Sequence, residues 1–410
     1  MKTSCDICVI GNGAIGKASA LALAQAGFEV VLVAPSSLSA GAPSAKPLSD
    51  TDHWDHRVYA LNHVARSLLD SLKVWDAMQA TRIAPVDAMT VQGDAPDQSG
   101  LLSFDAYGAR VGALAWIVED GNLNHALDAA LRFASGLEIV DGAANRLERS
   151  NDAAQITLDN GDVITSRLVV GADGAHSWVR TQADIGMDYR SYYQQAVVAN
   201  FEADSAHHGI ASQWFLGADG IVALLPLSGN RVSLVWSAPD ALANTLLHET
   251  AEQLAQRLMS LPGQTLGQLR MLPPAAPKSF PLRLIRSHAL IADRVALVGD
   301  AAHVVHPLAG QGMNLGFADI QALLDAIAAR DQLTDCGDAR TLGRYARARK
   351  EEVLLMQIAT DGLQRLFASE LPPVKLLRNA GMGLVNKLPF LKRRLMMHAL
   401  GPSPSIHTDS

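Results

Sequence analysis

Cysteine is scarce in this sequence: Cys5, Cys8 and Cys336 are its three cysteines in 410 residues. So few cysteines cannot build a disulfide framework and are typical of a reducing compartment, so we expect a cytoplasmic protein. Cys5 and Cys8 form a C-x-x-C pattern, but they fall within a predicted β-strand, where residues three apart point to opposite faces. This placement disfavours a redox or zinc-binding pair.

The sequence also lacks an excess of positive charge. Its formal net charge is −7 and its pI is near 6.0. Nucleic-acid binding normally requires a basic face, so we exclude nucleic acid as a partner.

Targeting signals and membrane-spanning runs are missing as well. The first predicted strand begins near Cys5, which leaves no room for a secretory signal, so we expect none. Between Ala18 and Ala45 the only charged residue is Glu29. Gly27 and Glu29 divide this stretch into a helix and a strand that are each too short to cross a bilayer.

The composition is that of an ordinary globular protein, with 49% hydrophobic and 18% charged residues. The length is sufficient for two domains and an appendage, and the sequence contains no internal repeats or low-complexity tracts.

The N-terminus predicts a βαβ unit with a glycine-rich turn. A strand at 5–10 leads into Gly11-Asn-Gly-Ala-Ile-Gly16, which is followed by a helix over 14–26 and a strand over 29–33. Gly11 allows the tight turn, Gly13 lets the backbone approach a pyrophosphate, and Gly16 lets the helix pack on the sheet. The positive end of the helix favours the same ligand. These glycines predict a dinucleotide site.

One expected feature of such a site is absent. The acidic residue that hydrogen-bonds the ribose at the end of the second strand is replaced by Ala34. A hydroxyl of Ser36 or Ser37 is a partial substitute. We therefore expect the adenosine end of the ligand to be held more weakly than usual.

Later patterns predict a nucleotide domain that is interrupted. An amphipathic helix is expected over about 60–80, a hairpin turn over 159–161 and a strand over 167–170. Strand-like stretches dominate from about 190 to 281, namely 194–201, 221–226 and 231–236. A strand over 294–298, a turn at Gly299-Asp300 and a helix from near Gly312 then return to the first pattern.

We assign the chain to three regions on these grounds. The nucleotide-binding domain comprises residues 1–80, 105–185 and 283–330. The β-rich substrate domain comprises residues 81–104 and 186–282, and the C-terminal helical region comprises residues 331–410.

Two further segments resemble the paired Asp-Gly and Gly-Asp motifs of the flavin-dependent aromatic hydroxylases. They are residues 168–180, which contain Asp173-Gly174, and residues 296–314, which contain Gly299-Asp300. The resemblance implies that the cofactor is FAD. It also implies an α/β fold with a Rossmann-like FAD-binding domain of the para-hydroxybenzoate-hydroxylase type, an inserted β-rich substrate domain and a C-terminal helical segment.

Several residues in these segments are expected to contact the cofactor. Asp300, just past a strand end, can accept hydrogen bonds from ribityl hydroxyls. The turn that begins at Pro307 precedes a helix, so its backbone amides can face the flavin pyrimidine and stabilise negative charge there. We assign the environment of the flavin ring to Pro307, Gly310 and Gln311, and cofactor binding to Gly299, Asp300, Gly312, Met313 and Asn314.

Three charged residues complete the predicted cofactor site. Asp173 and Arg180 resemble the family pair that acts near the pyrophosphate and the pyridine nucleotide. Arg57 lies in Asp55-His-Arg57-Val-Tyr-Ala-Leu61, a segment that resembles the one in which the family places an arginine near the flavin phosphates. We expect Arg57 at the start of a helix, while an ordinary exposed arginine remains the alternative.

No protein acid, base or metal site is assigned. His303 and His306 with Asp300 could suggest a metal, but they fall in a strand-to-helix loop without a complete ligand shell, so we expect none. The flavin carries the hard chemistry. The aromatic residues Trp214, Phe215 and Trp236 line an apolar pocket or, as is more usual for strands, form core.

Weaker segments resemble the hydroxylases of ubiquinone biosynthesis, and this likeness extends over nearly the whole chain. They are residues 223–227, 235–236, 280–282, 316–319 and 377–382. The resemblance implies that NADH or NADPH reduces FAD, that oxygen then forms a flavin C4a-hydroperoxide, and that its distal oxygen attacks the ring of a polyprenyl phenol. Protein groups need only position the ring and exclude water.

Such a substrate resides in a bilayer, and residues 371–408 provide a candidate contact. This segment holds six basic and no acidic residues among apolar ones, so it suits an anionic lipid surface, and the protein is then peripheral to the membrane. Packing on its own protein or on a partner in a biosynthetic complex is an equal alternative. A homo-oligomer also stays open.

Other functions remain open at this point. The protein could hydroxylate a soluble aromatic acid, or act as a flavin oxidase or reductase. It could also be a non-catalytic subunit that keeps the flavin fold, an alternative that Ala34 supports. The ring position, the choice between NADH and NADPH, and the oligomeric state are not determined by the sequence.

Overall fold

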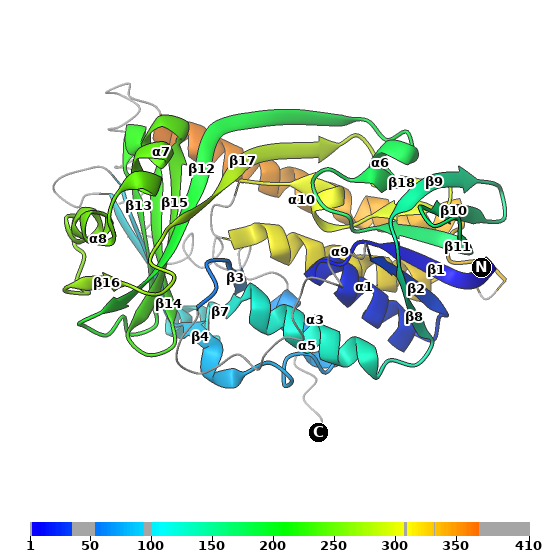
Figure 1. Ribbon diagram of the computed structural model, residues 1–410, viewed down its shortest axis with the longest axis horizontal. Coiled ribbons are helices and arrows are strands. Elements are labelled where there is room, and N and C mark those ends of the chain that lie inside the picture. Colours follow the sequence, from blue (N-terminus) through cyan, green and yellow to red (C-terminus); the bar gives the residue numbers. More distant parts are fainter. Residues whose placement is uncertain (1, 35–53, 94–99, 307–309, 332, 369–410) are drawn as a thin grey trace.

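The computed structural model describes residues 2–34, 54–93, 100–306, 310–331 and 333–368. Two sheets lie at opposite ends of the molecule, and helix α9 (Gln311–Ala328) runs between them (Figure 1). The arrangement confirms the expected α/β fold with a second, β-rich region.

The first sheet has the order β18-β19-β11-β1-β2-β8, with β9 and β10 attached beside β11. Strands β19, β11, β1, β2 and β8 pair in parallel. The strands span Lys2–Ile10 (β1), Val30–Ala34 (β2), Leu137–Asp141 (β8), Ala144–Arg149 (β9), Ala154–Leu158 (β10), Val163–Gly171 (β11), Ile291–Ala292 (β18) and Val295–Leu297 (β19).

Continuous apolar strands suit this parallel sheet because both of its faces are covered, one by helices and the other mainly by β9 and β10. All five residues of β2 are buried, and helix α1 (Ala14–Gln25) packs on the sheet together with α5 (Asp120–Arg132) and α9. The predicted βαβ unit is confirmed, with β1 beginning three residues earlier than expected. The hairpin with its turn at 159–161 is also confirmed by the antiparallel pairing of β10 with β11.

The helix predicted over about 60–80 is wrong. Residues Val58–Leu61 form strand β3, which pairs with β7 (Ala115–Glu119) beside β4 (Ile83–Val86) in a small third sheet. Helix α3 then covers only His63–Ser71. Asn62 caps its start by accepting a hydrogen bond from the Ala65 amide, and Lys73 ends the region with a left-handed φ of 61°.

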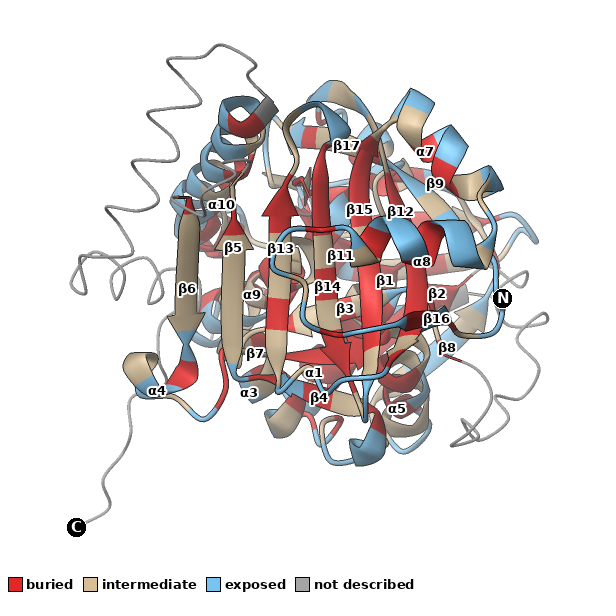
Figure 2. Ribbon diagram, turned by 90° about the vertical axis from the view of Figure 1, so that its left-hand side faces the viewer, coloured by how far each residue is buried: buried red, intermediate tan, exposed pale blue. Residues whose placement is uncertain are grey.

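The second sheet has the order β20-β17-β12-β15-β14-β13-β5-β6, with β16 attached to β12. Its strands span Ala88–Gln92 (β5), Leu101–Asp105 (β6), Met187–Ala203 (β12), Ile210–Phe215 (β13), Ile221–Leu227 (β14), Arg231–Pro239 (β15), Leu269–Met271 (β16), Lys278–Ser287 (β17) and His303–Val304 (β20). Its outer face is covered by α7 (Asp240–His248) and α8 (Ala251–Met259), as Figure 2 shows.

Side-chain alternation gives the second sheet two different faces. Val197, Val222 and Leu234 belong to the core beneath α7 and α8. Asn200 points the other way, and its Nδ2 donates hydrogen bonds to the carbonyls of Trp54 and Asp55 at 3.3 and 2.8 Å. We call this side, which faces the first sheet, the inner face.

The two halves are joined by long strands and by the C-terminal helix. Strands β12 and β17 run from the second sheet towards α6 (Trp178–Gln182) and the first sheet (Figure 1). Helix α10 (Ala339–Ala368) packs along α9 and reaches the second sheet, where Phe367 stacks on Phe215 with ring centroids 3.7 Å apart. The short elements that remain are η1 (Ala80–Arg82), α4 (Ala106–Ala109), η2 (Gly217–Asp219) and η3 (Gly299–Ala301).

Candidate active site

The glycine turn lies at the carboxyl end of β1, where the sheet and α1 meet. A Cβ at Gly11 would collide with the Ala172 carbonyl, and a Cβ at Gly16 would collide with the Gly11 carbonyl. A Cβ at Gly13 would meet no atom within 4 Å. Gly13 is also the N-cap of α1 and offers no side-chain cap, so the first amides of the helix are available to an anion. This geometry fits a pyrophosphate.

The end of β2 lacks a carboxylate, as the sequence indicated. Ala34 is buried, and the parallel register places Asp141 of β8 beside it. Asp141 had no local signal in the sequence, because its position beside Ala34 depends on the pairing of strands about 100 residues apart. Ser36 and Ser37 lie outside the described residues.

Asp300 follows β19, in the short helix η3. Its side chain is accessible to solvent although protein atoms surround it on most sides, and this burial raises its pKa. His303, Arg57 and Arg283 counteract the rise through their charges. A carboxylate so placed can accept hydrogen bonds from a polyol.

Arg57 belongs to the same charged group but not to a helix. The expectation that it begins a helix is wrong, because strand β3 starts at the next residue. Its guanidinium lies 5.4 Å from the ring centroid of Tyr59, whose hydroxyl donates to Asp120 at 2.6 Å. Arg57 is exposed and its charge acts on Asp300, so it is free to meet a second anionic group.

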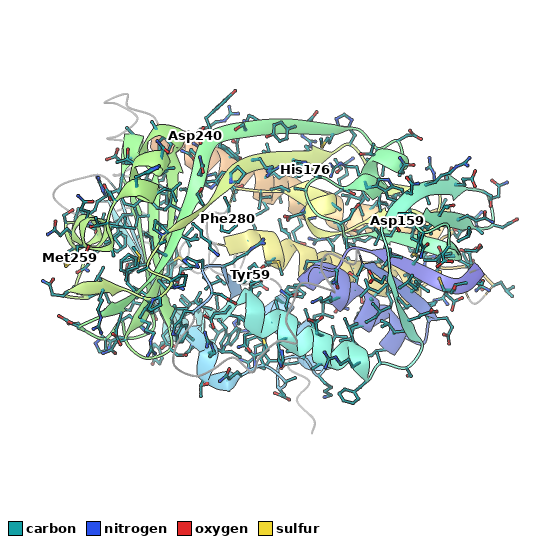
Figure 3. All side chains as sticks on the ribbon, viewed as in Figure 1. Tyr59, Asp159, His176, Asp240, Met259 and Phe280 are labelled. Atoms are coloured by element: carbon teal, nitrogen blue, oxygen red, sulfur yellow. The ribbon has the colours of Figure 1, made fainter. Side chains whose placement is uncertain are left out.

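Arg283 on β17 is a site residue that sequence analysis missed. Its Nη1 donates to Nε2 of His176, 2.6 Å away, and its charge also acts on Asp300. Figure 3 places Tyr59, His176 and Phe280 around the middle of the molecule, between the two sheets. No local pattern distinguished Arg283 from other strand arginines.

The start of α9 forms another part of the site. Gly310 is its N-cap, with φ 65°, and a Cβ there would lie 3.2 Å from the Ala60 Cβ. A Cβ at Gly312 would meet no atom within 4 Å, so this end of the helix faces open space. Asn314 fixes the helix start to β3: its Nδ2 donates to the Ala60 carbonyl at 2.9 Å, and its Oδ1 accepts from the Asn62 amide at 3.0 Å.

The other residues predicted at this turn are placed differently. Gln311 lies in the first turn of α9, where the Asn314 amide is 3.5 Å from its Oε1. Met313 packs against the core of the first sheet. Pro307 lies outside the described residues.

Asp173 and Arg180 are tied into the protein. Asp173 accepts hydrogen bonds from the Ser177 hydroxyl at 2.5 Å and the Val179 amide at 2.9 Å. Arg180 is buried, which lowers its pKa, and it donates to the carbonyls of Ala301 and Ala175. The pair therefore connects the Asp-Gly segment to the loop that carries Asp300.

A buried ionic group lies behind that loop. Asp319 of α9 accepts hydrogen bonds from the Gly299 amide at 2.8 Å, from Nε2 of His303 at 2.7 Å and from Nε of Arg349 at 2.7 Å. Asp319 and Arg349 were not predicted as site residues. Asp319 belongs to the segment 316–319 that carried the family resemblance, whereas Arg349 had no local signal.

The inner face of the second sheet contains a row of uncharged side chains, which we call the roof. One cross-strand row contains Val198, Val235, Ala223 and Gln213. Val235, Ala223 and Gln213 are half-buried, unlike the fully buried side chains of the outer face. These side chains carry no charge, so the roof suits an uncharged ring.

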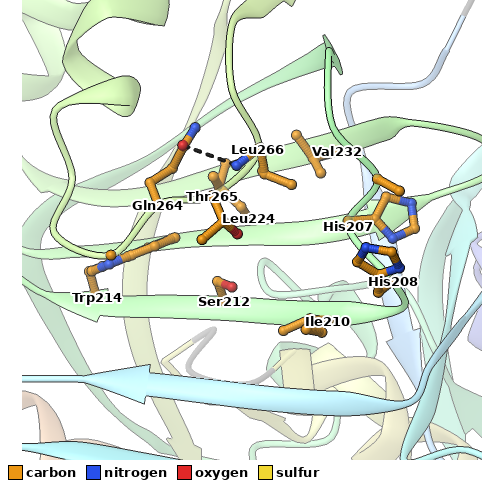
Figure 4. Close-up of a pocket in the computed structure, with 12 residues that line it drawn as sticks. His207, His208, Ile210, Ser212, Trp214, Leu224, Val232, Gln264, Thr265 and Leu266 are labelled. Atoms are coloured by element: carbon orange, nitrogen blue, oxygen red, sulfur yellow. Dashed lines mark hydrogen bonds between the residues drawn. The ribbon is translucent and has the colours of Figure 1, made fainter.

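The tryptophans considered as pocket residues belong to the outer face. Trp214 and Trp236 lie in the core beneath α7 and α8, and their indole N–H groups donate to the carbonyls of Pro262 and Asp219. Trp214 does border a pocket of about 60 Å³ with His207 and Gln264 (Figure 4). Ligand pockets usually measure about 300 to 1,000 Å³, so this pocket is too small for a ring substrate.

The described residues contain neither a cluster suited to a metal ion nor a helix suited to span a membrane. Within residues 2–368 and outside the gaps named above, no group of three or more His, Cys, Asp or Glu side chains is placed to hold a metal ion. Of the helices that the structure describes, none is both long and apolar enough to cross a membrane.

The chain is similar to known flavoproteins and ubiquinone hydroxylases. A family model described as an FAD binding domain matches residues 122–356, and one described as glucose inhibited division protein A matches residues 6–200. The chain is 35% identical to "Ubiquinone hydroxylase UbiL" of Rhodospirillum rubrum, over 97% of this chain and 89% of that protein. It is 34% identical to "3-demethoxyubiquinol 3-hydroxylase" of Escherichia coli, over 97% and 98%.

Among solved structures, p-nitrophenol 4-monooxygenase PnpA from Pseudomonas putida DLL-E4 has the same fold. The TM-score is 0.75 at 19% identity, and the match covers 98% of this chain and all of that one. The glycine turn, the Asp300 loop and the open start of α9 fit FAD. The chain therefore belongs to the FAD-dependent monooxygenases of the ubiquinone-biosynthesis hydroxylase family.

Proposed function

We propose that this enzyme hydroxylates the aromatic ring of a ubiquinone precursor, a polyprenyl phenol, with NADH or NADPH and O₂ as co-substrates. One observation carries the proposal: the inner face of the second sheet, which faces the first sheet, carries an uncharged row formed by Val198, Val235, Ala223 and Gln213, of which the last three are half-buried. An electron-rich apolar ring fits between such a roof and a flavin, and the names of the relatives support the same substrate class.

The cofactor is held, in this proposal, by the glycine turn, Arg57, Asp300 and the start of α9. The amides beyond Gly13 contact the pyrophosphate, Arg57 contacts a phosphate, and Asp300 accepts hydrogen bonds from the ribityl chain. The amides of Gly312, Met313 and Asn314, at the start of α9, face the pyrimidine of the flavin. Pro307, Gly310 and Gln311 provide the surroundings of the ring.

The flavin, once bound and reduced, supplies the electrons and the activated oxygen for hydroxylation. The protein orients the phenol, keeps water out and holds the cofactor. Asp173 and Arg180 support the loop of Asp300 through the Ala301 carbonyl, and the pair is proposed to border the path of the pyridine nucleotide. We propose that residues 1–80, 105–185 and 283–330 bind the cofactor. Residues 81–104 and 186–282 then bind the substrate.

The apolar substrate also suggests where the protein acts. We propose a cytoplasmic enzyme that contacts the membrane, or a partner of a biosynthetic complex, through residues 371–408. This segment lies outside the described residues, so its charge and composition carry the proposal. Assembly into a homo-oligomer stays a hypothesis.

A hydroxylase of soluble aromatic acids is the competing proposal. Its substrate carries a carboxylate, which would need a cation on the roof, and the four residues of the row provide none. The scaffold alternative is less favoured because Gly13 and Gly312 face open space suited to a ligand.

The test combines a cellular and a purified assay. Deleting the gene in its host should cause an under-hydroxylated quinone intermediate to accumulate, identified by mass spectrometry. The purified protein should be yellow and should convert a prenylated phenol into a product heavier by one oxygen atom. A normal quinone profile with lost growth on an aromatic acid would favour the competing hydroxylase, and a colourless protein that never binds FAD would favour the scaffold.

A further inference from the structure

His306 is a buried side chain at the junction of the flavin loop and the second sheet. It lies two residues beyond β20 and is fully buried. Its Nε2 is 3.3 Å from Oε1 of Gln194, and its ring packs edge-on against Tyr192 with centroids 4.9 Å apart. Nothing in the cofactor site described above uses this side chain.

A bulge in β12 creates the contacts of His306. The pairing of β12 with β17 shifts register between Ser191 and Gln195. Within the bulge Tyr193 has a left-handed φ of 53° and is exposed, while Tyr192 and Gln194 both reach the histidine. Bulges and left-handed side-chain residues are costly features that occur often beside active sites.

One nitrogen of the imidazole is left over. Because the Gln194 oxygen faces Nε2, we assign the ring hydrogen to Nε2 and a lone pair to Nδ1. This Nδ1 is buried and has no hydrogen-bond partner among the described residues. Buried polar atoms are normally paired, so a lone acceptor in an enzyme suggests a missing donor.

Burial keeps the imidazole ring neutral, although a carboxylate lies nearby. Burial lowers the pKa of His306 to about 4, and Asp361 of α10 only partly opposes this shift. Asp361 is itself paired with Arg190 of β12 and with Arg365, and the Tyr192 hydroxyl lies 3.4 Å from it. His306 is thus an uncharged acceptor near neutral pH.

His306 contacts the same face of the second sheet that carries the roof. Gln194 precedes Ala196 on β12, and Ala196 is paired with Phe280 of β17, which is 41% exposed. The row of Val198, Val235, Ala223 and Gln213 continues the same face. Gln194, Ala196 and Val198 are alternate residues of β12, so the residue that contacts His306 and the uncharged row lie on one face of the second sheet.

On the basis of the ring hydroxylation proposed above, we propose that Nδ1 of His306 accepts a hydrogen bond from the hydroxyl group of the phenolic substrate. The bond orients the ring and raises the electron density on its oxygen, which favours attack by an electrophilic oxygen. Gln194 is a positioning residue that fixes the tautomer of the histidine. No proton transfer is required.

The test compares two ligands on the purified FAD-loaded enzyme. The probes are 2-(3-methylbut-2-enyl)phenol and its methyl ether, which has nearly the same shape but no hydroxyl donor. Their dissociation constants are measured from the change in flavin absorbance. We expect the wild-type enzyme to bind the phenol roughly threefold to tenfold more tightly, which is the range of one neutral hydrogen bond.

Two substitutions separate the nitrogens of His306. His306→Gln keeps an amide near Nε2 and should reduce the preference for the phenol to about one, with binding of the ether retained. His306→Asn keeps an amide near Nδ1 and should retain most of the preference. Gln194→Leu removes the oxygen that holds the hydrogen on Nε2, so it should give an intermediate preference for the phenol. This variant tests the proposal if the His306 variants do not fold. His248→Gln, on the outer face, is the matched control.

The outcomes distinguish this inference from the proposed function. Hydroxylated product from the wild-type enzyme, together with an unchanged phenol preference in His306→Gln, overturns the role of His306 alone. Equal loss of flavin content and thermal stability in both His306 variants, without a change in preference, assigns the residue a structural role. A flavin-loaded wild-type enzyme that hydroxylates no phenol overturns the proposed function instead.

Discussion

His303 and Asp319 face each other inside the fold, with Nε2 of the histidine 2.7 Å from Oδ2 of the carboxylate. The same carboxylate accepts from the Gly299 amide and from Arg349, so it joins the Asp300 loop to α9 and α10. Burial alone would raise the pKa of Asp319, but His303 and Arg349 lower it below its usual value. The loop that presents Asp300 is thereby held by a buried charge.

Arg349→Met should destabilise the protein by about 3–5 kcal/mol, because it leaves Asp319 as a buried charge with one cation fewer. The midpoint of urea unfolding at pH 7 measures the change. Arg349→Lys keeps the charge and should recover part of the loss. Stability equal to wild type in Arg349→Met would show that the pair contributes nothing.

Asp300→Ala should lose bound flavin without unfolding. Asp300 is accessible, and the surrounding burial raises its pKa, so the native fold gains little from its charge. We expect at least tenfold less FAD per protein after purification and a melting temperature close to that of the apo wild-type protein. Asp293→Ala, in the exposed turn between β18 and β19, is the control. Full flavin content in Asp300→Ala would contradict the assigned role.

The glycines of the first turn should respond to substitution in opposite ways. Gly13→Val projects into open space, so the apo protein should unfold at the wild-type temperature while FAD affinity drops strongly. Gly16→Ala forces a methyl group into the Gly11 carbonyl, so the protein itself should be destabilised. Thermal melts with and without FAD separate the two effects. If Gly13→Val binds FAD with wild-type affinity, Gly13 does not lie beside the pyrophosphate.

Ala34→Glu should tighten FAD binding by about tenfold, the range of a hydrogen bond to a charged group, because the carboxylate can accept from ribose hydroxyls. Asp141, paired with Ala34 in the sheet, will reduce the gain through like-charge repulsion. Titration of apo protein with FAD measures the affinity. Ala34→Gln is the uncharged control, and equal affinities of the three proteins would mean that Ala34 is not at the ribose.

His306 should make folding stability depend on pH in a specific window. The unfolded chain binds a proton near pH 6.5, whereas the folded protein resists it until about pH 4. Stability from this group is therefore present above pH 6.5 and falls by roughly 3 kcal/mol as the pH drops towards 4. His306→Asn should lack this part of the acid loss. The free energy of unfolding of both proteins is measured between pH 7 and pH 4. If it falls equally in both, His306 is not a buried neutral histidine.

The sequence determined features that depend on neighbours along the chain. The strand-turn-helix around Gly11–Gly16, the hairpin at 159–161 and the loop at Gly299-Asp300 were predictable because each has a local period or a backbone requirement. The helix over 60–80 was mispredicted because the pairing of β3 with β7, some 55 residues away, outweighs an amphipathic pattern.

Only the tertiary structure decided which distant side chains meet. Arg349 reaches Asp319 from 30 residues away, Asp141 lies beside Ala34 through strand register, and His306 meets Gln194 across 112 residues. Such contacts follow from the packing of sheets and helices, which local spacing does not encode. The sequence thus indicated FAD as the cofactor through its family motifs, and the tertiary structure decided which side chains meet around the Asp300 loop and His306.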